Sequence, residues 1–330
     1  MTPPLPRELQ VEVTGACNLR CRMCLVRYRP ALERMEGSLP FETFRRVVDE
    51  LPALSKLTLQ GLGEPLLAPD LFRMVEHAAA RGIRVGFNTN ATLLTRATAA
   101  RLVDAGLDWL HISLDGATPE TYESIRDGAR FRRVARNVAG LVEVMRERGA
   151  ERPRLAVVFV AMRRNVGELP ALVRLVAAWG VPALRVQNLS HSFDDRASDP
   201  AYGEIGAFTA AEALWEADPE VSAILAEARR VAGETGVALR LPDGADDAEA
   251  AAPPAAGCDW PWRSAYLRHD GLVQPCCMLM GEDRAVLGDI REAGFAAVWR
   301  GDRYESFRAA LLTESPPEVC RGCSMYRGVF

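Results

Sequence analysis

Three cysteines near the start of the chain carry the clearest chemical signal. Cys17, Cys21 and Cys24 are spaced as C-x3-C-x2-C and follow Gly15. Three thiolates can hold three irons of a [4Fe–4S] cube and leave the fourth iron open. An open iron can bind a small chelating ligand, which a cluster closed by four cysteines cannot do. The triplet therefore indicates an iron–sulfur site that does chemistry.

Structural zinc and disulfides are the alternatives for this triplet. Structural zinc draws on four ligands, commonly two C-x-x-C pairs or a mixture of cysteine and histidine. Here the triplet stands alone, and the nearest histidine downstream is His77. Disulfides belong to oxidising compartments, and the sequence shows no export signal. An iron–sulfur cluster is the preferred interpretation.

A second set of cysteines lies near the other end of the sequence. Its spacing is C-x17-C…C-x2-C, formed by Cys258, Cys276, Cys320 and Cys323. Four such thiolates can close a [4Fe–4S] cluster or a zinc tetrahedron, and spacing alone does not choose. Asp270-Gly271 predicts a β-hairpin turn that would carry Cys276 back beside Cys258. Cys277 is left over, although its adjacency to Cys276 leaves the choice between them open.

Alternating strands and helices must position these residues. The pattern of Leu9, Val11 and Val13 against polar neighbours predicts a first strand. Further strands are predicted over 57–59, 83–87, 109–114, 155–160 and 184–186, with helices over 41–51, 69–81, 95–105, 131–148 and 166–179. Six βα units imply a parallel α/β sheet with fewer units than a closed eightfold barrel. In such folds chemistry occurs at the C-terminal ends of the strands, where the triplet lies.

Polar residues follow several of these strands. They are Gly63-Glu64-Pro65 after the second, Asn88 and Asn90 after the third, Ser113 and Asp115 at the fourth, and Arg126 shortly beyond. Without a ligand, such residues are ordinary turns, a helix cap and a solvated arginine. His191 follows the sixth strand beside Asp194 and Asp195. A histidine there can act as a base or substrate contact, or simply be hydrogen-bonded within its loop.

The triplet loop resembles the cluster loop of the radical S-adenosylmethionine (SAM) enzymes. In that family the open iron binds the amino and carboxylate groups of SAM. The reduced cluster then splits SAM into methionine and a 5′-deoxyadenosyl radical, which removes a hydrogen atom from a substrate. The resemblance implies a partial (β/α)6 TIM-type barrel. One departure is Met23, at a position that is often aromatic in the family.

The same resemblance assigns roles to the polar residues at the strand ends. Gly63-Glu64-Pro65 resembles the family's Gly-Glu-Pro motif, which contacts the SAM amino group. The run from Ser113 to Arg126 resembles Ser-Leu-Asp-Gly…Tyr-x-x-Ile-Arg, so Ser113 would touch SAM and Arg126 would pair with its carboxylate. The implied cofactor-binding residues are Gly63, Glu64, Pro65, Asn88, Asn90, Ser113, Asp115 and Arg126.

The C-terminal region resembles the SPASM/twitch extension of radical SAM enzymes. The matching stretches are Asp-Gly-Leu-Val-Gln-Pro-Cys-Cys at 270–277, Leu-Gly-Asp-Ile at 287–290 and Val-Trp-Arg-Gly at 298–301. The cysteine count suits the shorter twitch form, with one auxiliary cluster. The resemblance thus implies two [4Fe–4S] clusters and SAM, with metal ligands Cys17, Cys21, Cys24, Cys258, Cys276, Cys320 and Cys323. With four protein ligands the auxiliary cluster would have no open iron. Direct binding of the substrate to it is then disfavoured, and a role as an electron relay is favoured.

Three regions are predicted. Residues 1–190 form the partial barrel, 191–256 a helical bridge with an acidic Ala/Pro-rich loop, and 257–330 the small auxiliary-cluster domain with a β-hairpin and helix. Within the bridge, a loop precedes helical periodicity over 209–234 and a short strand over 237–241. The net charge of −4 gives no basic footprint for nucleic acid. No stretch reaches the apolar length of a membrane span, so we predict a cytoplasmic protein.

The predicted reaction is oxidation of a small polar metabolite, with the auxiliary cluster accepting an electron. This reaction would resemble that of the twitch-type dehydrogenases, which convert an amino-sugar-like secondary alcohol to a ketone. A flavodoxin or ferredoxin would supply electrons. The alternative is modification of a ribosomal peptide or protein, although the first strand starts by Leu9 and leaves no room for an N-terminal precursor-binding domain. A non-catalytic iron–sulfur or zinc protein would need neither Gly63-Glu64-Pro65 nor the open three-cysteine site.

Overall fold

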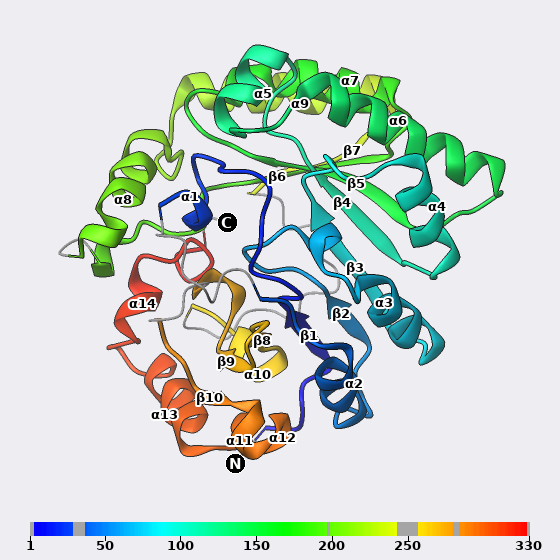
Figure 1. Ribbon diagram of the computed structural model, residues 1–330. Helices are drawn as coiled ribbons and strands as arrows, with labels where there is room; N and C mark the ends of the chain where they lie inside the picture. Colours follow the sequence, from blue (N-terminus) through cyan, green and yellow to red (C-terminus); the bar gives the residue numbers. More distant parts are fainter. Residues whose placement is uncertain (1–2, 29–36, 197–198, 243–256, 280–283, 329–330) are drawn as a thin grey trace.

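The computed structural model describes residues 3–28, 37–196, 199–242, 257–279 and 284–328 (Figure 1). In this part of the chain ten strands form one sheet, in the order β10-β9-β8-β1-β2-β3-β4-β5-β6-β7. Among the described residues the two edge strands, β10 and β7, do not pair with each other. The curved sheet is therefore not closed into a barrel. The acidic loop predicted over 243–256 lies outside the described residues.

Seven parallel strands make the partial TIM barrel. They are β1 Glu8–Val11, β2 Lys56–Thr58, β3 Arg84–Thr89, β4 Trp109–Ser113, β5 Arg154–Val160, β6 Ala183–Gln187 and β7 Ala238–Arg240. The helices between them lie on the outside of the sheet (Figure 1). They are α2 Phe41–Asp49, α3 Leu71–Ala80, α4 Arg96–Asp104, α5 Pro119–Ile125, α6 Phe131–Glu147, α7 Leu169–Ala178 and α9 Pro219–Thr235.

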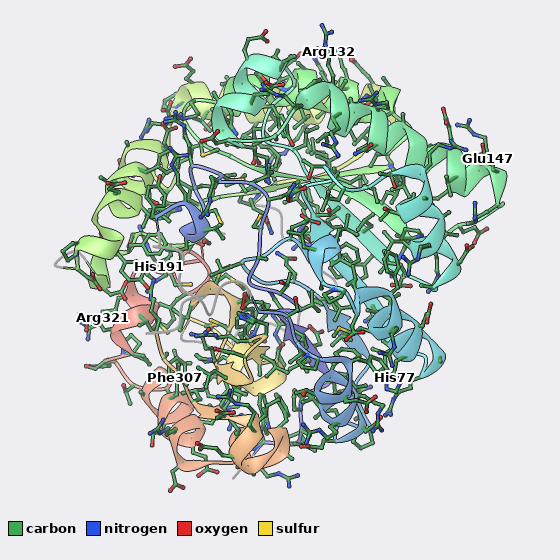
Figure 2. The ribbon with its side chains drawn as sticks, in the orientation of Figure 1. His77, Arg132, Glu147, His191, Phe307 and Arg321 are labelled. Atoms are coloured by element: carbon green, nitrogen blue, oxygen red, sulfur yellow. The ribbon has the colours of Figure 1, made fainter. Side chains whose placement is uncertain are left out.

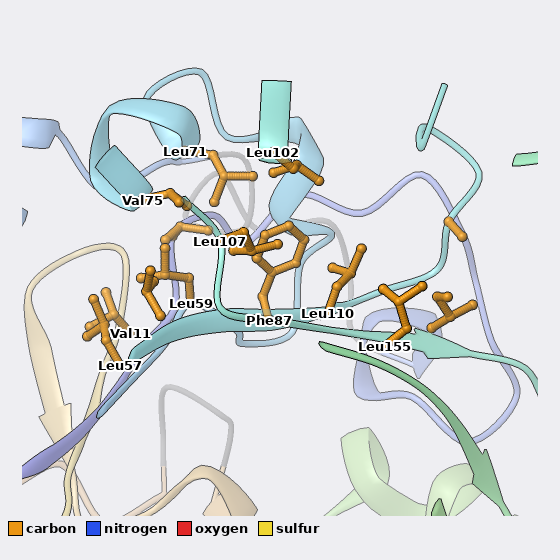
Figure 3. Close-up of a cluster of buried hydrophobic side chains, with 14 of the residues drawn as sticks. Val11, Leu57, Leu59, Leu71, Val75, Phe87, Leu102, Leu107, Leu110 and Leu155 are labelled. Carbon is orange, nitrogen blue, oxygen red and sulfur yellow. The ribbon is translucent and has the colours of Figure 1, made fainter. Parts of the chain in front are cut away.

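Successive side chains along each strand point alternately to the outer and the inner face of the sheet. Leu57 and Leu59, together with Phe87 and Leu110, point outward and pack against the helices in one continuous core (Figure 3). Their neighbours along each strand, such as Asn88 and His111, therefore face the inside of the curve. This alternation places the polar residues at the strand ends on one concave face.

The bridge differs from its prediction in two ways. Helix α8 (Pro200–Glu212) occupies most of the region predicted as a loop, because Tyr202 and Ile205 bury their side chains against Leu25 and Phe193. A break then separates it from α9, whose first turn is capped by Asp218. The predicted strand near 237–241 is present as β7, but it pairs with β6 and extends the barrel sheet to a seventh parallel strand.

The C-terminal region joins the barrel through its first strand. The predicted hairpin is confirmed: β8 (Tyr266–Leu267) and β9 (Leu272–Gln274) are antiparallel, and Gly271 has a φ of 90° in the turn. Strand β8 pairs in parallel with β1, and β10 (Gly288–Asp289) pairs with β9. Helices α10 Trp260–Arg263, α11 Ile290–Ala293, α12 Phe295–Trp299, α13 Asp302–Leu311 and α14 Glu318–Arg321 complete the region.

None of the described helices combines the length and apolar character needed to cross a bilayer.

Candidate functional site

The three-cysteine loop lies between β1 and the short helix α1 (Leu25–Tyr28) and is held on the segment after α5. The N–H of Arg20 donates to the carbonyl of Asp127 over 3.0 Å, and the N–H of Arg22 donates to the carbonyl of Ile125 over 2.9 Å. The guanidinium of Arg20 donates to the carbonyl of Val26 over 2.6 Å. These bonds fix the loop's backbone independently of any bound group.

The thiols of this loop suit metal ligation. Burial raises the pKa of Cys21 to about 11 and that of Cys24 to about 12, and it raises the pKa of Cys17 as well. The three sulfurs are close enough that the neighbouring thiols add to the shifts of Cys21 and Cys24. Buried thiolates of this kind are stable when metal ions balance their charge. The residues therefore fit the cluster that the sequence predicts.

The Gly63-Glu64-Pro65 turn supports the cluster loop directly. The N–H of Glu64 donates to the carbonyl of Ala16 over 2.8 Å. A Cβ atom on Gly63 would lie 2.2 Å from the carbonyl oxygen of Thr14 and 2.6 Å from that of Ala16. Only glycine allows this approach of the two backbones.

The Glu64 carboxylate is buried and accepts hydrogen bonds from neighbouring residues of the fold. It is 3% exposed and accepts from the Thr89 hydroxyl over 2.6 Å and from the N–H of Asn90 over 2.8 Å. Burial raises the pKa of Glu64, while these two donors lower it. The Asn90 side chain then donates to Asn18 in the cluster loop over 3.0 Å. Glu64 and Asn90 thus form one network that joins β2, β3 and the loop.

Asn88 and Ser113 lie apart from that network, on the concave face of neighbouring strands. Asn88 is in register with His111, and its Oδ1 lies 3.1 Å from His111 Nδ1. Ser113 lies two residues further along β4, on the same face as His111, and is half-buried. Burial, followed by Arg185 and Lys56, lowers the pKa of His111 to about 3, so its imidazole is neutral at physiological pH.

Asp115 and Arg126 form a buried ion pair beside the cluster loop. Arg126 Nε donates to Asp115 Oδ2 over 2.7 Å, and Arg126 Nη1 lies 3.9 Å from Cys21 Sγ. Burial lowers the pKa of Arg126, but Asp115, Cys21 and Tyr122 together raise it by more, so the guanidinium keeps its charge. The solvated-arginine alternative is wrong, because Arg126 is 8% exposed. The helix-cap alternative is also wrong, because Thr118 caps α5.

This pair predicts a large stability effect. Asp115→Asn leaves a buried guanidinium without its counter-charge, which we expect to lower the free energy of unfolding by about 3–5 kcal/mol. Urea titration of anaerobic protein with equal iron content measures the loss. The matched control is Asp104→Asn, whose pair with Arg148 is exposed and should contribute at most about 1 kcal/mol. Equal losses in the two variants would contradict the assignment.

Four C-terminal cysteines line a second site, an apolar cavity. They are Cys258, Cys276, Cys320 and Cys323, and its walls include Trp260, Phe307, Leu311 and Met325. Burial raises the pKa of all four thiols, and neighbouring thiols contribute to the shift of Cys276 and of Cys320. The chemistry of this donor set fits a cluster closed by four thiolates. Because Cys276 lines the cavity and Cys277 instead opens the turn η5 (Cys277–Leu279), the geometry favours Cys276 as the ligand.

His191 lies beside this second site, in contact with the C-terminal segment near α14 (Figure 2). Its ring is fully buried, with Nε2 donating to the carbonyl of Val319 over 2.7 Å and Nδ1 accepting from the N–H of Phe193 over 2.9 Å. Both ring nitrogens are therefore occupied. Of the two interpretations open for His191, this geometry favours a hydrogen-bonded loop residue over a base.

A buried carboxylate on the concave face, Glu12, was not among the residues predicted from the sequence. Glu12 is 4% exposed, accepts from the Tyr266 hydroxyl over 2.8 Å and lies 3.6 Å from His269 Nδ1. A Cβ on Gly61 would clash with both Glu12 and Tyr266. The available signal was the alternation of Glu12 with Val11 and Val13, which places it on the inner face. Its partners come from β8 (Tyr266) and the turn after it (His269), some 250 residues away, and no local pattern reveals them.

Comparison with known sequences places the chain in a family. Residues 11–174 match the Radical SAM superfamily, and residues 258–324 match SPASM, an iron–sulfur cluster-binding domain. Together with the open α/β sheet and the two cysteine sites, these matches identify the family. The protein belongs to the radical SAM superfamily and carries a C-terminal SPASM domain. Its cofactors are accordingly SAM and [4Fe–4S] clusters, and the zinc and non-catalytic alternatives are set aside.

Individual relatives differ in their named roles. The tungsten-containing aldehyde ferredoxin oxidoreductase cofactor-modifying protein of Pyrococcus furiosus is 28% identical, over 97% of this chain and 87% of that protein. Mycofactocin maturase MftC of Mycobacterium tuberculosis is 31% identical over 58% of this chain, which spans about half of MftC. Streptococcus suis SuiB, solved with the precursor peptide SuiA, has a TM-score of 0.71 at 15% identity, over 98% of this chain and 70% of SuiB. This last likeness concerns the fold alone.

Proposed function

We propose that this radical SAM enzyme removes a hydrogen atom from its substrate and completes a two-electron oxidation. The observation that carries the proposal is the pair of cysteine sites on one sheet, with a three-cysteine loop after β1 and a four-cysteine cavity beyond β8–β9. When bound, the first cluster and SAM supply the 5′-deoxyadenosyl radical, and the closed second cluster supplies an electron acceptor.

Residues of the chain itself would hold the first cluster, bind SAM and line the substrate site. Cys17, Cys21 and Cys24 hold the first cluster, and the backbone of Gly63-Glu64-Pro65 receives SAM, since the Glu64 carboxylate is committed to Thr89 and Asn90. Asn88 and Ser113 line the concave face that the substrate shares. Arg126 is engaged by Asp115, so we place it as a support for the cluster loop rather than as the main partner of the SAM carboxylate.

Oxidation also releases a proton, and Glu12 is our candidate acceptor. For an alcohol, loss of the carbon-bound hydrogen atom leaves a radical. That radical becomes a ketone by giving one electron to the second cluster and its hydroxyl proton to a base. Glu12 is a buried carboxylate on the concave face, directly after β1, the strand that pairs with both β2 and β8. We place the auxiliary-cluster region at 257–330, as the sequence suggests, and the barrel at 1–190 together with β7 (Ala238–Arg240), which falls within the predicted bridge of 191–256 and pairs with β6.

The substrate proposal follows the named roles of the relatives. The Pyrococcus furiosus protein is named for modifying a cofactor, so we propose a cofactor or its precursor as the substrate class. The names of these relatives do not support the amino-sugar-like alcohol that the sequence analysis predicted as the substrate. Modification of a peptide is the second candidate, favoured by the precursor peptide bound to the similarly folded SuiB. The electron donor is proposed to be a flavodoxin or ferredoxin, and a cytoplasmic location stays a prediction.

Anaerobic reconstitution tests the proposal. With iron and sulfide the protein should bind about eight iron per chain, enough for two four-iron clusters. With SAM and dithionite it should release 5′-deoxyadenosine, read by mass spectrometry. Host-cell extract divided by ultrafiltration then tests the substrate class. Stimulation of 5′-deoxyadenosine release by the small-molecule fraction favours a cofactor precursor, and stimulation by a protease-sensitive fraction favours a peptide. Protein that binds zinc and makes no 5′-deoxyadenosine would contradict the proposed chemistry.

A further inference from the structure

Exposed arginines gather around the three-cysteine loop on its solvent side. Residues 18–28, which include most of the loop, and residues 120–136, which pack against it, contain eight arginines and three acidic residues. The chain as a whole has a net charge of −4, so this part differs in sign from the rest. Six of the eight side chains are exposed and define what we call the arginine surface: Arg20, Arg22, Arg130, Arg132, Arg133 and Arg136.

Direct contacts join the two parts of this surface. Besides the backbone bonds described above, Arg22 Nε donates to the carbonyl of Ser124 over 2.8 Å. A Cβ on Gly128 would lie 3.6 Å from the carbonyl oxygen of Asn18. Helix α6 begins three residues after this glycine, so the arginines of its first turns continue the surface of the loop. Figure 2 shows Arg132 at the outer edge of the molecule.

Nearby carboxylates offset only a small part of this charge. Asp127 pairs with the half-buried Arg27 over 3.1 Å, and Glu123 pairs with Arg130 over 3.0 Å. Within the ranges that the structure describes, the other five arginines of the surface form no ion pair. A patch of one sign attracts partners of the opposite sign and orients them during encounter.

The stability of α6 gives no reason for its arginines. Arg132 and Arg133 lie in the first turn, where the helix dipole favours anions over cations, and that turn holds no acidic residue. Arg136 follows Arg132 by four residues, an arrangement in which like charges destabilise a helix. These side chains are therefore better explained by an acidic partner than by the fold.

The position of the surface indicates what the partner does. Arg20 and Arg22 are exposed on either side of Cys21, which is buried. The arginine surface is thus the part of the exterior that directly adjoins the first cluster's ligands. SAM and the substrate are proposed to occupy the concave face, so a protein that reduces this cluster has to approach from the solvent side of the loop.

We propose that the arginine surface is the docking site for the electron donor, a one-electron carrier protein with an acidic face. In the docked complex one electron passes to the first cluster, and the carrier leaves oxidised by one electron. Electron-transfer interfaces are small and short-lived, so complementary charge chiefly raises the rate of encounter. Half-buried Tyr28, whose hydroxyl donates to the carbonyl of Arg22 over 2.6 Å, adds an aromatic side chain of a type enriched at interfaces.

Binding of an acidic flavodoxin to the full chain tests the docking site. The test variant is Arg132→Glu/Arg133→Glu, because neither side chain belongs to the cluster loop. Its Kd for oxidised flavodoxin, measured by calorimetry in about 0.01 M salt, should rise about tenfold. At about 1 M salt, where charges act over only about 3 Å, variant and wild type should converge. Glutamate is favoured in the first turn of a helix, so the variant should fold as well as wild type.

Turnover gives a second measurement on the reconstituted enzyme. The flavodoxin concentration for half-maximal release of 5′-deoxyadenosine should rise by about the same factor as Kd. With dithionite in place of flavodoxin, release should stay within about twofold of wild type, because a small reductant needs no docking surface. This contrast separates a docking defect from damage to the cluster or to the SAM site.

The matched control is Arg146→Glu/Arg148→Glu. Both side chains are exposed at the other end of α6, about 21 Å from Arg132 along the helix axis, and the change in net charge is the same. The Kd and the half-maximal flavodoxin concentration should stay within about twofold of wild type at the same low salt.

Two outcomes would overturn the inference. One is an equal loss of affinity in the test and control variants, since overall charge and not this surface would then govern binding. The other is failure of both the flavodoxin and an acidic ferredoxin to drive wild-type protein that responds to dithionite. The proposal rests on the proposed function only in requiring an external reductant for the first cluster. Failure of that function would instead appear as no 5′-deoxyadenosine from wild type even with dithionite.

Discussion

Replacing Cys21 by alanine should abolish formation of 5′-deoxyadenosine and remove about half of the bound iron. This is the largest expected effect, because Cys21 is the buried middle member of the three-cysteine loop proposed to hold the open cluster and lies 3.9 Å from the Arg126 guanidinium. Without a third thiolate the loop cannot hold a cluster that presents an open iron. Iron counting and mass spectrometry after anaerobic reconstitution measure both quantities.

Two cysteine controls accompany this variant. Cys320→Ala should also lose about half of the iron, from the other site, yet still form 5′-deoxyadenosine. Cys277→Ala should keep all of the iron and the activity, because Cys276 is the residue that lines the auxiliary cavity. If Cys277→Ala and not Cys276→Ala loses the auxiliary cluster, the ligand assignment must be exchanged between these neighbours.

The second large effect is expected from one added methyl group. Gly63→Ala places a Cβ within 2.2 Å of the Thr14 carbonyl oxygen and 2.6 Å of the Ala16 carbonyl oxygen. Both obstacles are backbone atoms leading into the cluster loop, so they cannot move aside without displacing Cys17. We expect 5′-deoxyadenosine formation to fall at least tenfold, as a displaced reacting centre commonly costs about a hundredfold.

A glycine with open space around it provides the control. Gly233 lies within α9 and has no neighbouring atom within 4 Å of its added Cβ, so Gly233→Ala should leave activity unchanged. It should also stabilise the helix by about 0.5–1 kcal/mol. Binding of SAM, measured by calorimetry, separates a displaced SAM site from a lost cluster. Wild-type activity in Gly63→Ala would show that the close backbone contact has no part in catalysis.

The sequence predicted the elements with strong local patterns and missed those decided by distant contacts. The barrel strands were found because Leu57, Phe87 and Leu110 mark regular alternation with polar neighbours. The cysteine spacings and strand-end motifs are local as well, and they led to the family. Helix α8 was missed because Tyr202 and Ile205 are buried only through contact with Leu25 and Phe193.

Two features of the site needed the three-dimensional fold. Arg126 looked like one arginine among many until its pairing with Asp115 buried it beside Cys21. Arg284 carried no motif at all, and Asp195, with which it pairs beside His191, lies 89 residues away in the sequence. Long-range ion pairs leave no periodicity in a single sequence, so neither pair could be derived from spacing.

The strand β1 is hydrogen-bonded to β2 on one side and to β8 on the other. This has a consequence for how the protein is made. Strand β1 is synthesised some 250 residues before its second neighbour, β8, so their pairing closes a very long loop. Until then, one edge of β1 presents unpaired amide groups directly before the first metal-binding cysteine. The strand that leads into the three-cysteine loop is therefore completed on both sides only when the C-terminal region has folded against it.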